Sequence, residues 1–173
     1  MGGTVGLDTK ALVIDEISFV QGVGIVDADT IKALSGLEFL SKIQVDELPQ
    51  PSIHQTFDFR MAEIEEGRAV FTGKPSAAFM NPMGTVHGSY ISALLDSAMA
   101  CSAHSLCPAG TANTTVEMKI NFVRPIFKES GRLFATGVVI NAGRTLVTTE
   151  GNLADENGKL YAHGTQTCMR MVL

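Results

Sequence analysis

The stretch of sequence that decides the fold runs from Asn81 to His104 and reads NPMGTVHGSYISALLDSAMACSAH. Between residues 75 and 116, which are 42 residues, Asp96 is the only Asp, Glu, Lys or Arg. From Ile91 onward the stretch is rich in Ala, Leu and Met with small Ser residues, as is typical of a helix surrounded by protein on most sides. We therefore expect a long buried helix from about His87 to Ser105, with one carboxylate along its length.

Two places on this expected helix carry chemistry. An Asp in the middle of an apolar helix is costly unless it is ionised with partners or needed for a reaction. The alternative to a catalytic role is a structural one, in which the Asp96 carboxylate only reaches solvent or a hydroxyl group. His87 and Gly88 fall at the helix start, where unpaired backbone N–H groups and the positive end of the helix dipole favour a developing oxyanion. A glycine there also lets a ligand approach the backbone closely.

The spacing of these two places bears on the assembly. If the helix begins at His87, Asp96 follows nine residues later, which is roughly 900° of rotation and about 13 to 14 Å of rise. The two residues then lie on opposite faces, too far apart to share one small site. If both are catalytic, the simplest geometry is a site between two chains, and the spacing conditionally predicts a homodimer.

Strand-like runs flank the helix, and one of them alternates clearly enough for one of its faces to be core. Asn157-Gly158 predicts a hairpin. The fold class is therefore α+β, with an antiparallel sheet whose apolar face is covered by the one large helix. The expected strands are 53–64 and 68–73 before the helix, and 111–123 (the alternating run), 130–141, 144–154 and 158–170 after it, the last four in meander order.

The residues before the sheet are expected to form an extension. We place it at residues 1–50, ahead of a domain over residues 51–173. Asp29-Thr30 offers an N-cap for one helix over about 30–43, because apolar residues recur there at helical spacing. This helix is expected to end before Pro49 and Pro51.

Composition limits the classes of function. The 173 residues are 45% hydrophobic and 18% charged, with a net charge of −5, which is the wrong sign for a protein that relies on phosphate contacts to nucleic acid. No run approaches 18 consecutive apolar residues, so no membrane span is expected. The N-terminal residues lack the pattern of a signal peptide, and three cysteines without CxxC spacing suit a reducing compartment, so we expect a cytoplasmic protein.

Taken in order, several motifs resemble one family. Asn81 to Gly88 with Asp96 after them, then the run from Thr114 to Pro125, and Gly143-Arg144-Thr145 resemble the hotdog-fold acyl-CoA thioesterases of the phenylacetate-degradation (PaaI) type, related to 4-hydroxybenzoyl-CoA thioesterases. The resemblance covers about residues 30–170. It implies an antiparallel sheet wrapped around one long central helix. It also implies hydrolysis of acyl-CoA to free acid and CoA by a homodimer or a homotetramer, with no cofactor because CoA is part of the substrate.

The resemblance also implies roles for single residues. The Gly88 N–H would polarise the thioester carbonyl, while Asn81 and His87 position the substrate or the attacking water. Asp96 of the facing subunit would be the nucleophile or the general base, oriented by Thr115. Arg124 and Arg144 are expected to contact the CoA phosphates or the subunit interface. Ser89 and Met83 are expected to contact the substrate or its CoA portion.

Other kinds of site have weaker support. No GxSxG motif surrounds Ser89, which disfavours a serine hydrolase, and the four histidines lack ligand spacing, so no metal site is expected. Cys101 lies within the apolar helix and is expected to be a core residue. Ser89 also stands where many relatives have a second glycine, which bears on the shape of the pocket. Two alternative functions stay open: a hotdog hydratase or dehydratase of enoyl or hydroxyacyl thioesters, and a non-catalytic acyl-CoA sensor.

Overall fold

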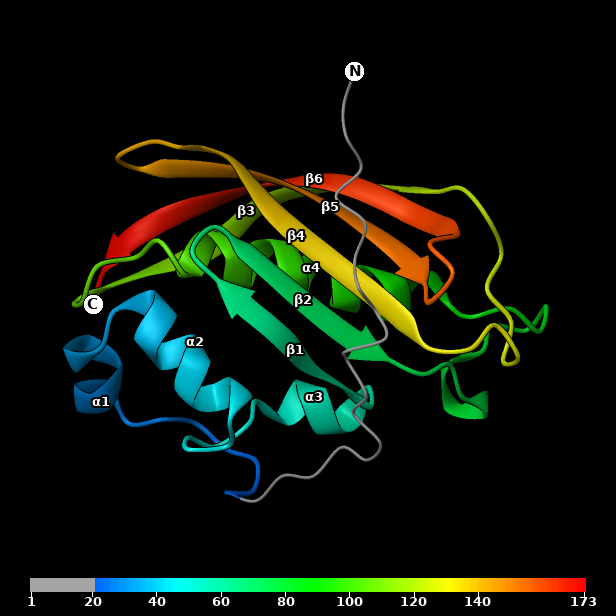
Figure 1. Ribbon diagram of the computed structural model, residues 1–173, viewed down its shortest axis with the longest axis horizontal. Helices are drawn as coiled ribbons and strands as arrows, with labels where there is room; N and C mark the ends of the chain where they lie inside the picture. Colours follow the sequence, from blue (N-terminus) through cyan, green and yellow to red (C-terminus); the bar gives the residue numbers. More distant parts are fainter. Residues whose placement is uncertain (1–20) are drawn as a thin grey trace.

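The protein is represented by a computed structural model, which describes residues 21–173, so the first part of the expected extension lies outside the described residues (Figure 1). The described strands form one antiparallel sheet in the order β1-β2-β4-β5-β6-β3. The elements are α1 (Ala28–Ala33), α2 (Gly36–Gln44), α3 (Ser52–Thr56), β1 (Phe59–Glu65), β2 (Arg68–Gly73), the 3-10 helix η2 (Ala77–Phe79), α4 (Gly88–His104), β3 (Thr111–Phe122), β4 (Leu133–Ala142), β5 (Leu146–Asp155) and β6 (Leu160–Val172).

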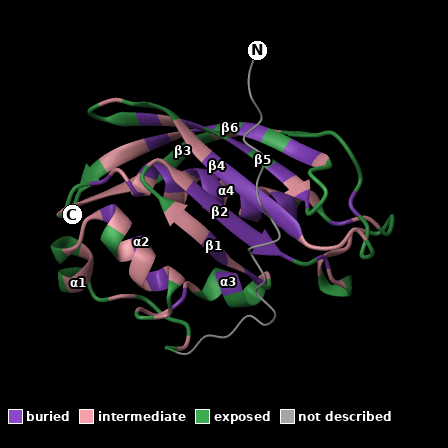
Figure 2. Cartoon of the chain, in the orientation of Figure 1, coloured by how far each residue is buried: buried purple, intermediate pink, exposed green. Residues whose placement is uncertain are grey.

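The expected long helix is confirmed as α4, and the sheet wraps around it as in a hotdog fold (Figure 1). Leu94, Leu95, Ala98 and Met99 of α4 are fully buried. Gly137 of β4 makes the close approach possible, because a Cβ at this position would collide with the backbone of Ala98. Buried positions accordingly gather on α4 and on the central strands β2 and β4 (Figure 2). None of the described helices is long and apolar enough to cross a membrane.

The position of β3 differs from the expected meander. β4, β5 and β6 follow one another as predicted, and the hairpin at Asn157-Gly158 joins the last two, with Gly158 at φ +76°. β3, however, pairs with β6 at the far edge of the sheet. The reason is that a strand has two edges, and those of β4 are already occupied by β2 and β5. β3 therefore becomes an edge strand.

A β-bulge changes which side chains of β3 face the helix. The register of β3 against β6 shifts between Thr115 and Glu117, so one extra residue enters the strand at Val116. Thr115 faces α4, while Met118 and Ile120 pack against the main core further along the strand. Strict alternation over 111–123, the pattern expected from the sequence, puts Thr115 and Met118 on opposite faces. This expectation is wrong, because a single bulge inverts the phase.

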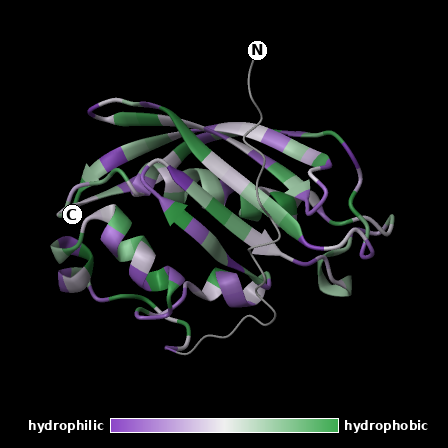
Figure 3. Ribbon diagram, viewed as in Figure 1, coloured by the Kyte–Doolittle hydropathy of each residue, from purple (hydrophilic) through white to green (hydrophobic). Residues whose placement is uncertain are grey.

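The extension contains more helices than expected. In place of one helix over about 30–43, α1 and α2 are separated at Leu34 and Ser35, because Ser35 and Glu38 form a capping box that starts a new helix. The short helix α3 replaces the first part of the strand expected over 53–64. Hydrophilic and hydrophobic positions both occur along α2 (Figure 3), and its Leu40 and Ile43 are buried.

Candidate active site

The loop before α4 is shaped by Asn81. Its Oδ1 accepts hydrogen bonds from the backbone N–H groups of Met83 (2.9 Å) and Thr85 (3.2 Å), and its Nδ2 donates to Thr85 Oγ1 (2.7 Å). The end of the loop is anchored where the His87 N–H donates to the carbonyl of Phe79 (2.7 Å). Asn81 therefore holds the loop that delivers the chain to the start of α4. A direct contact of Asn81 with substrate stays a prediction.

His87 is the N-cap of α4, and this role determines its tautomer. Its Nδ1 accepts the backbone N–H of Ser89 at 3.0 Å and lies 2.8 Å from Ser89 Oγ. Because an amide donates to Nδ1, this nitrogen carries no proton, so the Ser89 hydroxyl also donates to it. The proton of the neutral ring is then on Nε2, and the exposed His87 side chain offers an N–H donor.

Gly88 is the first residue of α4 and lies beside a cavity. As in any helix, its N–H has no acceptor within the helix. A cavity of about 340 Å³ is lined by Gly88, Phe122 and Arg124 together with neighbouring apolar residues. A Cβ on Gly88 would lie 3.4 Å from the Phe122 ring. The helix start and the end of β3 therefore border one hollow, with Arg124 among its lining residues. A backbone N–H at a helix start suits an oxygen that gains negative charge.

Asp96 belongs to a second group of polar side chains. Thr115 Oγ1 donates to Asp96 Oδ1 at 3.0 Å, and Gln166 Nε2 donates to Thr115 Oγ1 at 2.7 Å. Because the Thr115 oxygen already accepts from Gln166, its own proton is directed to the carboxylate. Asp96 is half-buried and Gln166 is 1% exposed. In this carboxylate cluster (Asp96, Thr115, Gln166), Thr115 Oγ1 is hydrogen bonded to one carboxylate oxygen of Asp96, and Gln166 supports Thr115.

Sequence reasoning missed Gln166, although a signal was present. From Ala162 to Cys168, every second residue of β6 is buried, namely Ala162, Gly164, Gln166 and Cys168. A glutamine within this inward-facing row is the one long polar side chain there, and a buried amide has to find partners. The signal was therefore a long polar residue, Gln166, in the row of β6 positions that face the core.

Thr115→Val should lower kcat by about ten- to a hundredfold with little change in KM. Valine keeps the shape but removes a hydrogen bond to a charged group, which is typically worth about 1.5–3 kcal/mol, and leaves the Gln166 amide without its acceptor. Steady-state kinetics of acyl-CoA hydrolysis, the reaction that the family resemblance implies, checks this. Thr115→Ser is the matched control and should retain most of the activity, since it restores the hydroxyl. Equal losses in both variants would show that the hydroxyl does not matter.

The two groups do not meet within one chain. Gly88 and Asp96 are eight residues apart on α4, which is about 12 Å of rise. The amide cluster (His87, Gly88, Ser89) lies at the helix start by Phe122, whereas the carboxylate cluster lies at the helix middle by Thr115. The separation expected from the sequence is thus present in the structure.

The remaining predicted residues have different surroundings. Arg124 lines the cavity beside Gly88 and its Nη1 donates to the carbonyl of Leu160 at 2.6 Å. Arg144 is exposed in the β4–β5 turn, close to Leu146, which pairs with Met169, the partner of Thr114. The β4–β5 turn therefore lies at the same end of the sheet as Thr114. Met83 is 85% exposed and does not line the cavity beside Gly88.

The described part of the chain also bears on metal binding and on thiol chemistry. Among residues 21–173, no group of three His, Cys, Asp or Glu side chains is arranged to hold a metal ion. Cys101 is a core residue of α4, as expected. Burial, and secondarily the charge of Asp96, raise the pKa of the Cys101 thiol to about 12, so this thiol is protonated at neutral pH.

Comparisons with known proteins identify the family. The model of the Thioesterase superfamily matches residues 83–162, which include both clusters except Gln166. A protein of Saccharolobus solfataricus that is named as a presumed esterase is 31% identical over 110 residues, covering 64% of this chain and 76% of its own length.

Solved structures are similar as well. A Thioesterase family protein from Silicibacter pomeroyi has a TM-score of 0.69 at 26% identity, covering 78% of this chain and 99% of that one. A phenylacetic acid degradation-related protein from Ralstonia eutropha, named as a presumed thioesterase, has a TM-score of 0.69 at 27% identity, covering 76% and 98%. These names favour a hydrolase that acts on thioesters. With the hotdog fold and the sequence match taken together, this chain belongs to the thioesterase superfamily and is of the PaaI-like type.

Proposed function

We propose that this protein hydrolyses an acyl-CoA thioester to a free acid and CoA, at a site composed of residues from two subunits. The observation that carries the proposal is the division of the polar groups along α4. Hydrogen-bond donors for a carbonyl oxygen gather at its start, and a carboxylate oriented by Thr115 lies at its middle. Among residues 21–173 of its own chain, each group lacks the partner that thioester hydrolysis requires.

The edge strand β3 supports the assembly. In the described sheet it pairs with β6 alone, and it exposes Val116 (51%) and Phe122 (54%). An edge strand with exposed apolar side chains is a template for pairing with a second copy about a two-fold axis. Gly88 lies against Phe122, and Asp96 is bonded to Thr115.

The register of such a pairing would complete the site. If two copies of β3 pair antiparallel about a point between Met118 and Lys119, Phe122 of one strand lies opposite Thr115 of the other. Gly88 of one subunit then faces Asp96 of its partner. The same pairing places Arg124 of one subunit and Arg144 of the other toward one site, where their charges would bind the phosphates of CoA.

The chemistry follows from the groups that meet. Asp96 either takes a proton from a water that attacks the thioester carbonyl carbon, or attacks that carbon itself to form an anhydride that water then hydrolyses. In both routes the carbonyl oxygen becomes negative, and the N–H of Gly88 and the Nε2–H of His87 stabilise that charge. The C–S bond breaks, and CoA leaves as the thiolate.

The proposal is tested by incubating the purified protein with a panel of acyl-CoA thioesters and measuring free thiol. We expect CoA release well above the uncatalysed rate for at least one acyl group. The same samples are analysed for hydration of enoyl-CoA. Reversible hydration without CoA release would replace the proposal by a hydratase, and thermal stabilisation by acyl-CoA without any turnover would replace it by a sensor.

A further inference from the structure

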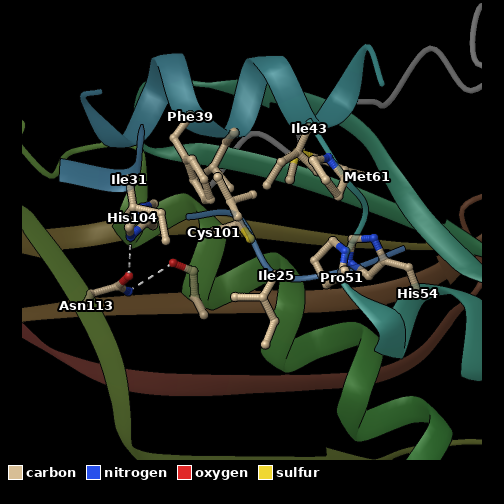
Figure 4. Close-up of a pocket in the computed structure, with 15 residues that line it drawn as sticks. Ile25, Ile31, Phe39, Ile43, Pro51, His54, Met61, Cys101, His104 and Asn113 are labelled. Carbon is tan, nitrogen blue, oxygen red and sulfur yellow. Dashed lines mark hydrogen bonds between the residues drawn. The ribbon is translucent and has the colours of Figure 1, made fainter. Parts of the chain in front are cut away.

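A second cavity lies between the N-terminal extension and α4. Its volume is about 380 Å³, and residues of α1, α2 and the loop before α3 cover one side of it. Figure 4 shows Phe39 and Ile43 reaching from α2 toward Cys101 on α4. His104 and Asn113 close one end of the cavity in this view, and Pro51 and His54 close the other. The extension thus forms a wall of the cavity rather than an appendage.

The lining of this cavity is apolar and uncharged at neutral pH. Most of its side chains are aliphatic or aromatic, and its two histidines are hydrogen bonded at Nδ1, His54 to Gln50 (3.0 Å) and His104 to Asn113 (2.7 Å). Burial, with a smaller effect of the Arg60 charge, lowers the pKa of His54 to about 4, and burial lowers the pKa of His104. An anionic or cationic group would find no opposite charge among these lining residues.

The cavity adjoins the carboxylate cluster. Ala100, which lines it, follows Asp96 by one helical turn on α4, about 6 Å along the axis. Asn113, another lining residue, precedes Thr115 by two residues on β3 and donates from Nδ2 to the Ala100 carbonyl at 3.0 Å. Cys101 also lines the cavity, and the charge of Asp96 contributes to the raised pKa of its thiol. One end of the cavity therefore lies next to the proposed reacting group.

Close backbone contacts hold the extension in this position. The Gly36 N–H donates to the carbonyl of Cys107 at 2.8 Å, and a Cβ on Gly36 would collide with the backbone carbonyl of His104. At the other end of α2, Gln44 Nε2 donates to the carbonyl of Ala62 at 2.7 Å. These contacts pin both ends of α2 against the hotdog domain, so the cavity has a built wall.

We infer that this cavity binds the acyl group of the substrate, and that the N-terminal extension thereby selects uncharged, apolar acyl groups of medium length. The inference rests on the proposed function for the identity of the molecule. Since an apolar cavity of about 150 Å³ holds benzene, one of 380 Å³ has room for on the order of ten to fifteen carbon atoms. Groups as small as acetyl would leave most of it empty, and a terminal carboxylate would be buried without a partner.

The first test compares hydrolysis of decanoyl-CoA and butyryl-CoA. The wild-type protein should have the higher kcat/KM for decanoyl-CoA. Ile31→Trp fills the cavity from α1, a partly exposed position, and should lower the ratio of decanoyl to butyryl kcat/KM about tenfold or more. Val45→Trp introduces the same side chain at a 62% exposed position outside the cavity and should leave this ratio unchanged. Phe39→Ala enlarges the cavity and should move the preference toward longer chains.

A binding measurement separates this inference from the proposed function, because it needs no hydrolysis. Decan-1-ol, an uncharged ten-carbon probe, is titrated into the 173-residue protein by calorimetry. Ile31→Trp should raise its Kd about tenfold or more, and Val45→Trp should not. If decan-1-ol binds as expected but no acyl-CoA is hydrolysed, the proposed function fails and the cavity assignment stands. If decanoyl-CoA and butyryl-CoA are hydrolysed with equal kcat/KM and Ile31→Trp leaves their ratio unchanged, the cavity assignment is overturned.

Discussion

Replacing Asp96 with alanine is expected to lower kcat for acyl-CoA hydrolysis by about 10³-fold, within the range of about 10²- to 10⁴-fold that general acid–base catalysis contributes. Asp96 is the only formal charge between residues 75 and 116, and Thr115 and Gln166 orient it. Its loss removes the group that activates water or attacks the thioester. Free-CoA release at saturating substrate measures the effect, and KM should change little because the binding surface is retained.

Asp96→Asn is the matched variant for this experiment. An asparagine oxygen still accepts the Thr115 hydrogen bond, so the fold and the neighbouring side chains stay in place, but the amide is neither a base nor a nucleophile. It should therefore lose nearly as much kcat as Asp96→Ala. Wild-type rates in either variant across the acyl-CoA panel would remove Asp96 from the reaction.

Gly88→Pro is expected to lower kcat by about 10²- to 10³-fold, the usual effect of removing one oxyanion donor. Proline lacks the N–H, yet it is well tolerated as the first residue of a helix. The preceding residue, His87, has φ −66° and ψ 140°, which a residue before proline readily adopts. The substitution therefore removes the donor without an obvious reason for α4 to unfold.

Gly88→Ala distinguishes the loss of the N–H donor from steric crowding against Phe122. Alanine keeps the N–H and adds a Cβ 3.4 Å from the Phe122 ring, as proline does. The rate of Gly88→Ala should thus stay well above that of Gly88→Pro, with circular dichroism and thermal unfolding confirming that both are folded. If the two variants lose the same activity, crowding against Phe122 explains the loss and the amide is not the donor.

Gly88→Pro and Asp96→Ala, when mixed, test whether the site is shared between subunits. In an equal mixture of Gly88→Pro and Asp96→Ala chains that exchange freely, half of the dimers contain one of each, and each of these holds one intact site of two. About a quarter of wild-type activity should then return upon mixing, although each variant alone is nearly inactive. Mixtures that show subunit exchange but no recovery would place the whole site within one chain.

The prediction from sequence was most accurate for α4. Its length and burial followed from a run of small and apolar residues that cannot form an exposed helix, and the spacing of Gly88 and Asp96 followed from helix geometry. These are local properties, each set within a few residues of chain. The break between α1 and α2 was also local, since the Ser35 and Glu38 capping box stood in the sequence, but the longer apolar period obscured it.

The phase and place of β3, by contrast, depend on partners distant in sequence. The bulge that turns Thr115 toward Asp96 arises from pairing with β6, about fifty residues further along the chain. Gln166 gains its role only because that pairing brings its amide to the Thr115 hydroxyl. Periodicity within one strand contains no information about such a register shift.

The amino-acid sequence by itself determined the class of fold, the central helix and the residue types at its start and middle, because helical period, capping and burial act over short distances along the chain. Only the tertiary structure decided which strand lies at the edge, how Gln166 and Thr115 hold Asp96, and that the extension closes a cavity beside that carboxylate. Those features result from the packing of segments that are 20 to 90 residues apart, where side-chain volume and hydrogen-bond geometry select one arrangement among many.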